Sequence, residues 1–562
     1  MDEKVLQFEK NHEIYCKKAV ERAENGDYEG ALRFLFCAKS LSDSIDVLAD
    51  IADVYADMGQ LELSNKYWFY YMDRAPKDKL GVAYEELAIN YFYMDDFLSS
   101  SYYFHLKLTT DGFISQENLD KEIVDFFSGE EFRRNSYHIA YPFDRADYSY
   151  QKKKGKRAIA SGGFTEAVKI IESIPVECRD EDTSGELAVS YFMSDDLESA
   201  EKVARESIKN HGENVTAYCN LSTVFDMKED FEKSDFYYRK ALSLRTGEKS
   251  EVFKIATCAI ERADHETARE CLEKILIERP YDIAMRFFYG MALLNLNNPD
   301  GAVREFERAH RISPTDIAVK YYLNYAKKVS ENGEDAENIL PLKYVKDLPE
   351  KIKKKYAKKI KALADSPEKI YSAMKKQENK DIAEWGLHST ESEIMRQSVY
   401  LFATAFTSNA KKALYDALLN PETTEECKRV ITYVLLAKGY KEKFGVVGGS
   451  YYLKIKPKKL VSEKDSEEGF IYLSAYALAL SRVMFRQTEG LEKIAQSIDK
   501  VYSKFKGVLT LSDVTNEEIA GVAVSECGFK YFDSDKKIIK LFEISKDKLD
   551  KLKAIVKGEK NA

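Results

Sequence analysis

The sequence has few of the residues that interrupt helices. Its 562 residues include only 11 prolines and 26 glycines, below the average usage of about 5% and 7%. Turns between short strands depend on these residue types, so their scarcity disfavours a strand-rich fold and predicts an all-α protein. The 44% of hydrophobic and 32% of charged residues are typical of a chain that folds. The length predicts about three or four domains, unless the chain is a repeat array.

The sequence also lacks a long apolar segment. No run reaches the about 18 uninterrupted apolar residues that a membrane-spanning helix needs. The first residues, MDEKVLQFEKNHEIYC, are acidic and lack the apolar core of a signal peptide. We therefore expect a soluble, cytoplasmic protein with no membrane partner.

Motifs for metal binding and catalysis are missing as well. The eight cysteines form no CxxC pair and the seven histidines form no HExxH pair, so neither a zinc site nor a disulfide framework is indicated. The GxSxG motif, the GxGxxG motif with a following acidic residue and the protein-kinase signatures are also absent. The sequence predicts no catalytic residue, no metal, no cofactor and no enzyme activity.

Charge is distributed unevenly along the chain. Residues 438–562 carry 24 Lys and Arg against 18 Asp and Glu, whereas residues 1–437 carry 62 against 77. The net charge of -9 therefore combines an acidic N-terminal part with a basic C-terminal part.

Small residues recur at regular intervals in the first 302 residues. Their spacings are 33, 36, 67, 33, 34, 34 and 34 residues, for Ala31, Ser64, Ser100, Ala167, Ala200, Ser234, Ala268 and Ala302. A turn precedes most of these anchors, as in GDYEGA and GGFTEA, and a bulky or apolar residue mostly follows four positions later. This period predicts helical hairpins in which the small residue lets two helices approach closely. The alternative is an ordinary helical bundle with chance spacing.

These units resemble tetratricopeptide repeats. The best match, residues 283–316, has Tyr289, Gly290 and Leu293 in its first helix and Ala302, Phe306, Ala309 and Pro314 in its second. Only Pro76, Pro280 and Pro314 occupy the closing proline position. The resemblance covers about residues 12–330 and implies a right-handed α-α superhelix, a solenoid whose concave groove holds a protein or peptide.

Six consecutive segments are predicted. They are three tetratricopeptide units in 1–113, an insertion or degenerate repeat in 114–147, five units in 148–330, a capping helix with HEAT-like hairpins in 331–440, a linker in 441–466 and a basic helical domain in 467–562. The linker sequence KFGVVGGSYYLKIKP predicts a short β-hairpin near 445–456, because two glycines separate two short apolar or alternating runs.

Acidic residues form a stripe on the predicted groove. In this repeat family the first helix of each hairpin lines the groove. The acidic residues on such helices are Asp46, Asp50, Asp53 and Asp57 in the second unit, and Glu85 and Glu86 in the third. The four aspartates are 4, 3 and 4 residues apart and fall on one helical face. Because like charges at this spacing repel, the stripe is either solvated surface or a site for a partner with a basic segment.

Two further sets of residues are groove candidates. Lys152, Lys153 and Lys156 lie in the run YQKKKGKR, which is either exposed surface or a site for a phosphate or an acidic tail. The apolar candidates are Phe287, Phe288, Met291, Tyr321, Tyr322 and Tyr325. Some of these six residues must belong to the core, and those that do not would form an apolar floor of the groove that contacts a peptide. No Lys, Asn and Arg carboxylate clamp can be assembled, so a C-terminal carboxylate ligand is disfavoured.

The C-terminal residues SDKKIIKLFEISKDKLDKLKAIV predict a short helix, a tight connection and a lysine-rich helix. They faintly resemble a helix-turn-helix in a cyclin-box-like domain. The resemblance implies nucleic-acid contact by Lys546, Lys548, Lys551 and Lys553. However, Glu543 stands where the turn usually has Gly, and no Arg follows Arg486. A helical interaction or dimerisation module is the alternative.

These observations predict a non-enzymatic protein–protein interaction scaffold that binds a peptide or protein segment in the concave groove. The alternative is a nucleic-acid-associated transcriptional regulator with a helix-turn-helix-like C-terminal domain. Neither the identity of the partner nor the oligomeric state follows from the residues.

Overall fold

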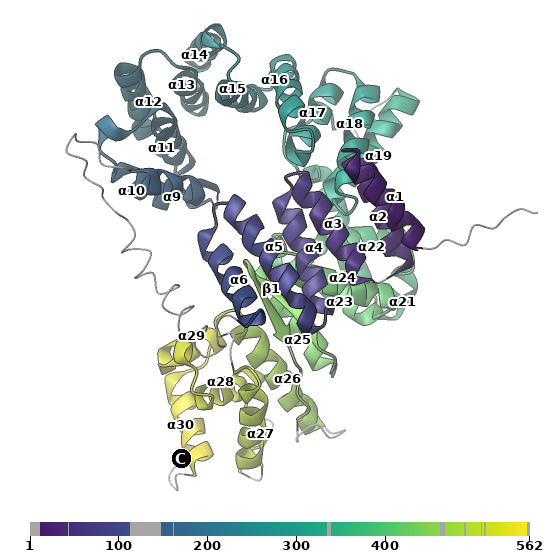
Figure 1. Cartoon of the computed structure of the whole chain (residues 1–562). Coiled ribbons are helices and arrows are strands. Elements are labelled where there is room, and N and C mark those ends of the chain that lie inside the picture. The colour runs from purple at the N-terminus through teal and green to yellow at the C-terminus, as the bar shows by residue number, and fades with distance from the viewer. Residues whose placement is uncertain are drawn as a thin grey trace, which may run out of the picture. The chain divides into compact units, whose positions relative to one another are not determined.

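The computed structural model describes residues 12–42, 44–112, 148–160, 162–333, 339–460, 467–487, 490–506, 508–510 and 513–558. Within these ranges the regular structure is helical except for one two-stranded sheet (Figure 1). The predicted all-α class with one short β-hairpin is therefore confirmed. The predicted insertion at 114–147 lies outside the described residues.

The chain forms two compact units. Unit 1 contains Met1–Leu41, Asp57–Gln60 and Ile114–Leu348, and unit 2 contains Ser42–Ala56, Leu61–Phe113 and Pro349–Ala562. This division groups the chain differently from the six consecutive segments, whose boundaries remain a prediction.

Unit 1 is a row of helical hairpins (Figure 1). Its helices are α1 (His12–Glu24), α2 (Tyr28–Leu41), α9 (Ser149–Ala160), α10 (Phe164–Glu172), α11 (Glu181–Met193), α12 (Leu197–His211), α13 (Val215–Met227), α14 (Phe231–Leu244), α15 (Lys249–Glu261), α16 (His265–Glu278), α17 (Ile283–Asn295), α18 (Pro299–Ile312) and α19 (Ile317–Asn332). The anchors of the repeat lie where its helices approach: all are fully buried, apart from Ser100 in unit 2, which is half-buried. The predicted packing role of the anchors is confirmed.

Most turns inside the hairpins share one local design. A residue in the left-handed region is followed by an Asp or Asn that caps the next helix. Ala263 has φ +56° and precedes Asp264, whose side chain accepts a hydrogen bond from the Thr267 amide at 3.1 Å. The same arrangement occurs with Asp95, Asp195, Glu229 and Asn297 as the left-handed residue. A cap of this kind stabilises a helix by about 1 kcal/mol, which offsets much of the cost of the left-handed residue.

The first hairpin also packs within unit 1 against α18. The carboxylate of Glu29 on α2 forms ion pairs with Nε of Arg308 at 3.2 Å and with Nε of Arg311 at 3.0 Å. The ring of Tyr28 meets that of Tyr281 edge-on, with centroids 5.8 Å apart. These contacts join segments about half the chain apart in sequence, and the order of the repeats does not predict them.

Unit 2 combines two N-terminal hairpins with the C-terminal helices. Its elements are α3 (Ile45–Asp57, without its last residue), α4 (Leu61–Arg74), α5 (Leu80–Tyr93), α6 (Phe97–Thr110), α20 (Glu350–Ala364), α21 (Pro367–Ala373), α22 (Gln377–Leu387), α23 (Ser392–Ala405), α24 (Ser408–Leu419), α25 (Glu425–Ala437), β1 (Phe444–Gly448), β2 (Tyr451–Ile455), α26 (Glu467–Val483), α27 (Lys493–Phe505), α28 (Asn516–Glu526), α29 (Asp535–Phe542) and α30 (Lys546–Lys557). One apolar core extends from Ile360 to Val556. The structure adds α21 and most of α22 to the helices expected from the sequence.

The β-hairpin is an internal part of unit 2. Its strands pair from Phe444 with Ile455 to Gly448 with Tyr451, and Gly449 takes the positive φ of +59° that its two-residue turn requires. The hairpin packs against α4 and α6: Tyr103 Oη donates to the Ser450 carbonyl at 2.6 Å. Besides linking α25 to α26, the hairpin therefore joins the N-terminal helices of unit 2 to the C-terminal ones.

Candidate functional site

The acidic residues predicted on the groove lie on α3 and α5. Asp46, Asp53 and Asp57 are exposed and Asp50 is half-buried. Burial, and secondarily the charge of Asp46, raises the pKa of the Asp50 carboxyl. On α5, Glu86 has a pKa raised by burial and by its neighbour Glu85. Glu85 forms an ion pair with Lys107 at 2.9 Å. The site for a basic segment remains a prediction.

The basic residues predicted on α9 are largely paired with acidic residues of α11 and its N-cap. Lys152 forms an ion pair with Asp180 at 2.6 Å, and Lys156 with Glu186 at 3.3 Å. Burial alone would raise the pKa of Asp180, but hydrogen bonds from Lys152 and Thr183 lower it to about 2. Lys153 is exposed. Two of the three lysines thus stabilise the contact between α9 and α11, which leaves less positive charge for an anionic partner than the sequence suggests.

Most of the apolar groove candidates are core residues, which corrects the sequence-based interpretation. Phe287 and Met291 are fully buried, and Tyr322 and Tyr325 are nearly so. The Phe287 ring packs edge-on against Phe306 and Tyr322, with centroids 5.5 and 5.2 Å away. The candidates Phe288 and Tyr321 alone remain half-buried. Helix α17 is apolar on several sides, so periodicity does not show which side faces a partner.

A segment of the chain itself lies against α16 and α17. We call this segment, 339–348, the strap. The side chain of Asn295 binds both backbone groups of Leu342: the Leu342 amide donates to Oδ1 at 2.6 Å, and Nδ2 donates to the Leu342 carbonyl at 2.9 Å. The strap has no helix or strand of its own. The amides of Val345, Asp347 and Leu348 bond to groups within the segment, and its other polar groups need partners outside it. Asn295 supplies two of these partners.

From Leu342 to Val345 the side chains of the strap alternate between the protein and solvent. Leu342 is buried in the apolar cluster of α17 and α19, and Lys343 and Val345 are exposed. Tyr344 packs near the rings of His265 and Phe288, with centroids 5.7 and 6.4 Å away. The strap is therefore extended around Leu342 and Lys343, with Leu342 and Tyr344 as inward positions. It bends at Tyr344, where the Val345 amide donates to the Lys343 carbonyl at 2.8 Å, and its last residue, Leu348, is buried.

A polar contact accompanies the inward tyrosine. Tyr344 Oη lies 2.9 Å from Nδ1 of His265 and donates to it in the neutral tautomer that carries its proton on Nε2. Burial lowers the pKa of His265, which favours the neutral form. Burial also raises the pKa of Tyr344 to about 12, so its hydroxyl keeps the proton it donates.

The far end of the strap is held by charge. Lys346 forms an ion pair with Asp316, the N-cap of α19, at 2.6 Å. Sequence reasoning missed this segment because it has no period. The signal available was a pair of prolines: Pro341 lies within the strap and Pro349 directly follows it, and Pro341 argues against a helix there.

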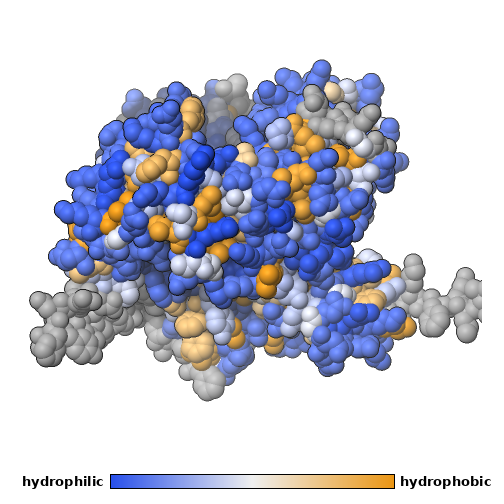
Figure 2. Space-filling view, turned by 90° about the horizontal axis from the view of Figure 1, so that it is seen from above, coloured by the Kyte–Doolittle hydropathy of each residue, from blue (hydrophilic) through white to orange (hydrophobic). Residues whose placement is uncertain are grey.

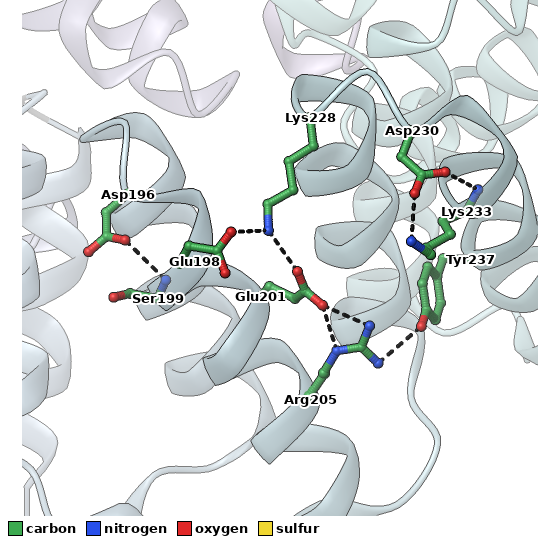
Figure 3. Close-up of polar contacts among 9 residues, drawn as sticks. All are labelled: Asp196, Glu198, Ser199, Glu201, Arg205, Lys228, Asp230, Lys233 and Tyr237. Carbon is green, nitrogen blue, oxygen red and sulfur yellow. Dashed lines mark hydrogen bonds and ion pairs between the residues drawn. The ribbon is translucent and has the colours of Figure 1, made fainter.

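A polar network connects the hairpin α11–α12 to the hairpin α13–α14 (Figure 3). Lys228, after α13, reaches the carboxylates of Glu198 and Glu201 on α12, both at 2.8 Å. Arg205 also binds Glu201 and donates to Tyr237 Oη at 3.1 Å. Partial burial would raise the pKa of Glu201, but hydrogen bonds from Lys228 and Arg205 lower it overall.

Apart from Asp196, the charged side chains shown in Figure 3 form ion pairs with one another. Asp230 and Lys233 form a further pair at 2.6 Å, beside the Lys228 cluster. Ion pairs this exposed contribute at most about 1 kcal/mol each. On the face shown in Figure 2, hydrophilic surface of this kind separates the hydrophobic patches. Because its charges pair with one another across two neighbouring hairpins, we assign the network to the contact between repeats.

The four lysines predicted on α30 divide into two groups. Lys548 donates to the Asp513 carbonyl at 2.7 Å and lies 3.8 Å from Glu518. Lys553 forms an ion pair with Asp535 on α29 at 2.9 Å. Lys546 and Lys551 are exposed. The turn before α30 holds Glu543 in the left-handed region, at φ +58°.

Two other kinds of site are absent from the described residues. In the described parts of the chain, no group of three or more His, Cys, Asp and Glu residues is placed to hold a metal ion. Among the described helices, none is long and apolar enough to cross a membrane. The predicted cytoplasmic location and the predicted lack of a cofactor and of enzyme activity stay predictions.

Comparisons with known proteins concern the repeats. A tetratricopeptide repeat model matches residues 215–247, which contain α13 and α14. The TPR repeat-containing protein YvcD of Bacillus subtilis (strain 168) is 22% identical over 234 residues, which are 41% of this chain and 47% of YvcD. The chain thus spans about half the length of this curated relative.

Solved structures show the same kind of similarity. YrrB, described as a TPR protein with an unusual peptide-binding site, is 22% identical, with 35% of this chain and 97% of YrrB covered and a TM-score of 0.25. Yeast Tom70 is 12% identical, with 88% of this chain and 97% of Tom70 covered and a TM-score of 0.28. The match of residues 215–247 to the repeat model confirms the resemblance to tetratricopeptide repeats, and the HEAT-like and cyclin-box-like segments stay predictions.

Proposed function

Because the chain contains tetratricopeptide repeats, we propose that it is a non-enzymatic protein-interaction scaffold whose hairpins bind an extended peptide segment of a partner. The observation that carries this proposal is the pair of hydrogen bonds between the Asn295 side chain and the backbone of Leu342. An amide side chain that binds an N–H and a C=O of one residue recognises extended backbone of almost any sequence. Neighbouring side-chain contacts then supply the selectivity.

The charge of α3 and α5 favours a partner with a basic segment. Asp46, Asp50 and Asp53 lie along one helix, and the raised pKa of Asp50 shows that burial and repulsion disfavour its ionised form. A cationic segment would relieve this repulsion on binding. Electrostatic complementarity of this kind increases association rates and selects against acidic partners.

The proposal is tested by screening the full-length protein against a displayed library of random ten-residue peptides. We expect enrichment of peptides that bind with micromolar affinity, and a preference for Lys and Arg that is lost in the Asp50→Lys/Asp53→Lys variant. The Glu232→Lys variant, which changes charge at an exposed position of α14 on a different hairpin, is the matched control. A screen without any enriched peptide would contradict the scaffold function.

Contact with nucleic acid is the second candidate, and the turn before α30 favours it. Glu543 adopts the left-handed conformation that a helix-turn-helix places at this position, and Ser545 caps α30 by accepting from the Lys548 amide at 3.3 Å. Lys546 and Lys551 are exposed and available to phosphates, whereas Asp547 and Asp550 on the same helix would repel them.

This candidate is tested by binding of the full-length protein to duplex DNA at several salt concentrations. If Lys546 and Lys551 contact phosphates, replacing both with Ala should reduce the slope of log K against log salt by about 2. Lys411→Ala on α24 serves as the control. Absence of salt-dependent binding at low ionic strength would rule out this function.

A further inference from the structure

The strap contacts its site as a bound peptide would. Around Leu342 one side chain binds its backbone, and Leu342 and Tyr344 point inward while Lys343 between them is exposed. Such alternation is the expected pattern for an extended ligand, because successive side chains of extended backbone point to opposite sides. The covalent connection to α19 and α20 is what distinguishes the strap from a partner.

We propose that the strap is an internal ligand that competes with an external peptide for the site formed by His265, Phe288 and Asn295. The external peptide would carry an aliphatic residue followed two positions later by a tyrosine, as Leu342 and Tyr344 do. This inference rests on the proposed scaffold function and names the peptide chemistry for one part of the array.

The contacts of Leu342 and Tyr344 define the selectivity of the site. Leu342 contributes an aliphatic side chain to an apolar cluster that includes Met291, and a polar residue there would be buried without a partner. Tyr344 combines an aromatic face against Phe288 with a hydroxyl at hydrogen-bond distance from His265. Phenylalanine would lose the hydroxyl contact, so tyrosine is the preferred residue at this position.

Tethering makes the strap a strong competitor even if its contacts are individually weak. A segment held next to its site by a short linker acts at an effective concentration of about 1 mM. If the free segment binds with a Kd of about 10–100 μM, an external peptide should bind the intact protein about 10- to 100-fold more weakly than it binds a protein with a released strap.

The experiment uses the full-length protein and a fluorescein-labelled peptide of the strap sequence, ILPLKYVKDL. Titrations compare the wild type, the strap-release variant Leu342→Ala/Tyr344→Ala, and the release variant with Asn295→Ala added. We expect the release variant to bind the peptide at least tenfold more tightly than the wild type, and the added Asn295→Ala to remove at least tenfold of this affinity. The same peptide with alanine at both inward positions should not bind.

Hydrogen exchange on the wild type gives a second test that needs no variant. An excess of unlabelled ILPLKYVKDL should increase exchange in the strap, and the alanine-substituted peptide should not. Equal binding to wild type and release variant, or binding that ignores Asn295→Ala, would overturn the inference, as would unchanged strap exchange.

The two proposals fail in different ways. A strap peptide that does not bind the release variant overturns the internal-ligand inference even when the library screen yields other peptides. If the strap peptide binds the release variant but a screen on both proteins yields no peptide, the strap is an internal ligand and the scaffold function is overturned.

Discussion

Asn295 and Leu342 share two hydrogen bonds although they are 47 residues apart in sequence. The amide side chain sits at the end of α17 and faces a backbone with no secondary structure. Since Leu342 is buried, its amide and carbonyl cannot readily exchange this partner for water. The local stability of the strap should therefore depend strongly on one side chain.

The first prediction concerns that side chain. Asn295→Ala should lower the free energy of opening the strap by about 1–3 kcal/mol, because it leaves the Leu342 amide and carbonyl without their partner. Hydrogen exchange of a peptide covering 339–348 measures the effect. Asn324→Ala replaces an exposed asparagine on α19 and is the control. Equal protection in the two variants would mean that Asn295 does not hold the strap.

The second prediction concerns the acidic stripe on α3. Burial, then the charge of Asp46, raises the pKa of Asp50 above its ordinary value of 3.8. The folded chain then binds the proton more tightly than the unfolded chain, so this carboxyl lowers stability as the pH rises through its pKa. Asp50→Asn should raise the free energy of unfolding by about 0.5 kcal/mol at pH 7, after allowance for solvent screening.

The pH dependence distinguishes this effect from a general change in surface charge. The gain should vanish below about pH 3, where the carboxyl is protonated in both states. Urea midpoints at pH 7 and pH 3 measure it, and Glu62→Gln, at an exposed position on α4, is the control. A destabilised Asp50→Asn protein at pH 7 would show that Asp50 is held by a favourable contact. If the Asp50→Asn protein is more stable but no longer binds basic peptides, Asp50 has a role in binding.

The repeats could be predicted from the sequence because their packing requires particular residue types at particular positions. Ala302 is small because its helix touches the partner helix of the hairpin, and Gly290 lacks a Cβ because one would lie 2.8 Å from the Phe306 ring. Asn298, which follows a left-handed residue, marks the start of α18. Each of these requirements acts over a few residues and leaves a periodic trace.

The strap and the docked β-hairpin could not be predicted, because their contacts are distant in sequence and leave no period. Tyr103 donates a hydrogen bond to the Ser450 carbonyl although the two residues are 347 positions apart in sequence, and no local pattern predicts that contact. The assignment of Phe287 to the groove failed for a related reason. Phe287 and Phe288 are adjacent on an apolar helix, and only tertiary packing determines that Phe287 is the buried one.

The third prediction concerns the docking of the β-hairpin in unit 2. The Asp73 carboxylate accepts from Tyr452 Oη at 2.9 Å and pairs with Lys454 at 2.6 Å. Because both partners are largely shielded, Asp73→Ala should lower the free energy of unfolding by about 1–3 kcal/mol. Asp78→Ala, at an exposed position nearby, should change it by less than about 0.5 kcal/mol. Equal urea midpoints for the two variants would show that this contact does not stabilise unit 2.

The last prediction uses the left-handed residue of one repeat turn. Ala263 has φ +56° and an exposed methyl group. Alanine at such a φ costs about 1–2 kcal/mol, and glycine adopts it freely. Glycine also gives the unfolded chain more freedom, which costs about 0.4–1 kcal/mol. The first effect is larger, so Ala263→Gly should stabilise the hairpin α15–α16 by about 0.5–1 kcal/mol.

The same substitution four residues earlier should have the opposite sign. Ala259 lies inside α15 and is fully buried, so Ala259→Gly should destabilise the hairpin by at least about 1 kcal/mol. Hydrogen exchange of α15 and α16 measures both variants on the same amides. If both glycine variants are less stable than the wild type, the contacts of the Ala263 side chain outweigh its backbone strain. The left-handed residues in the turns of the other repeats would then also be explained by their side-chain contacts.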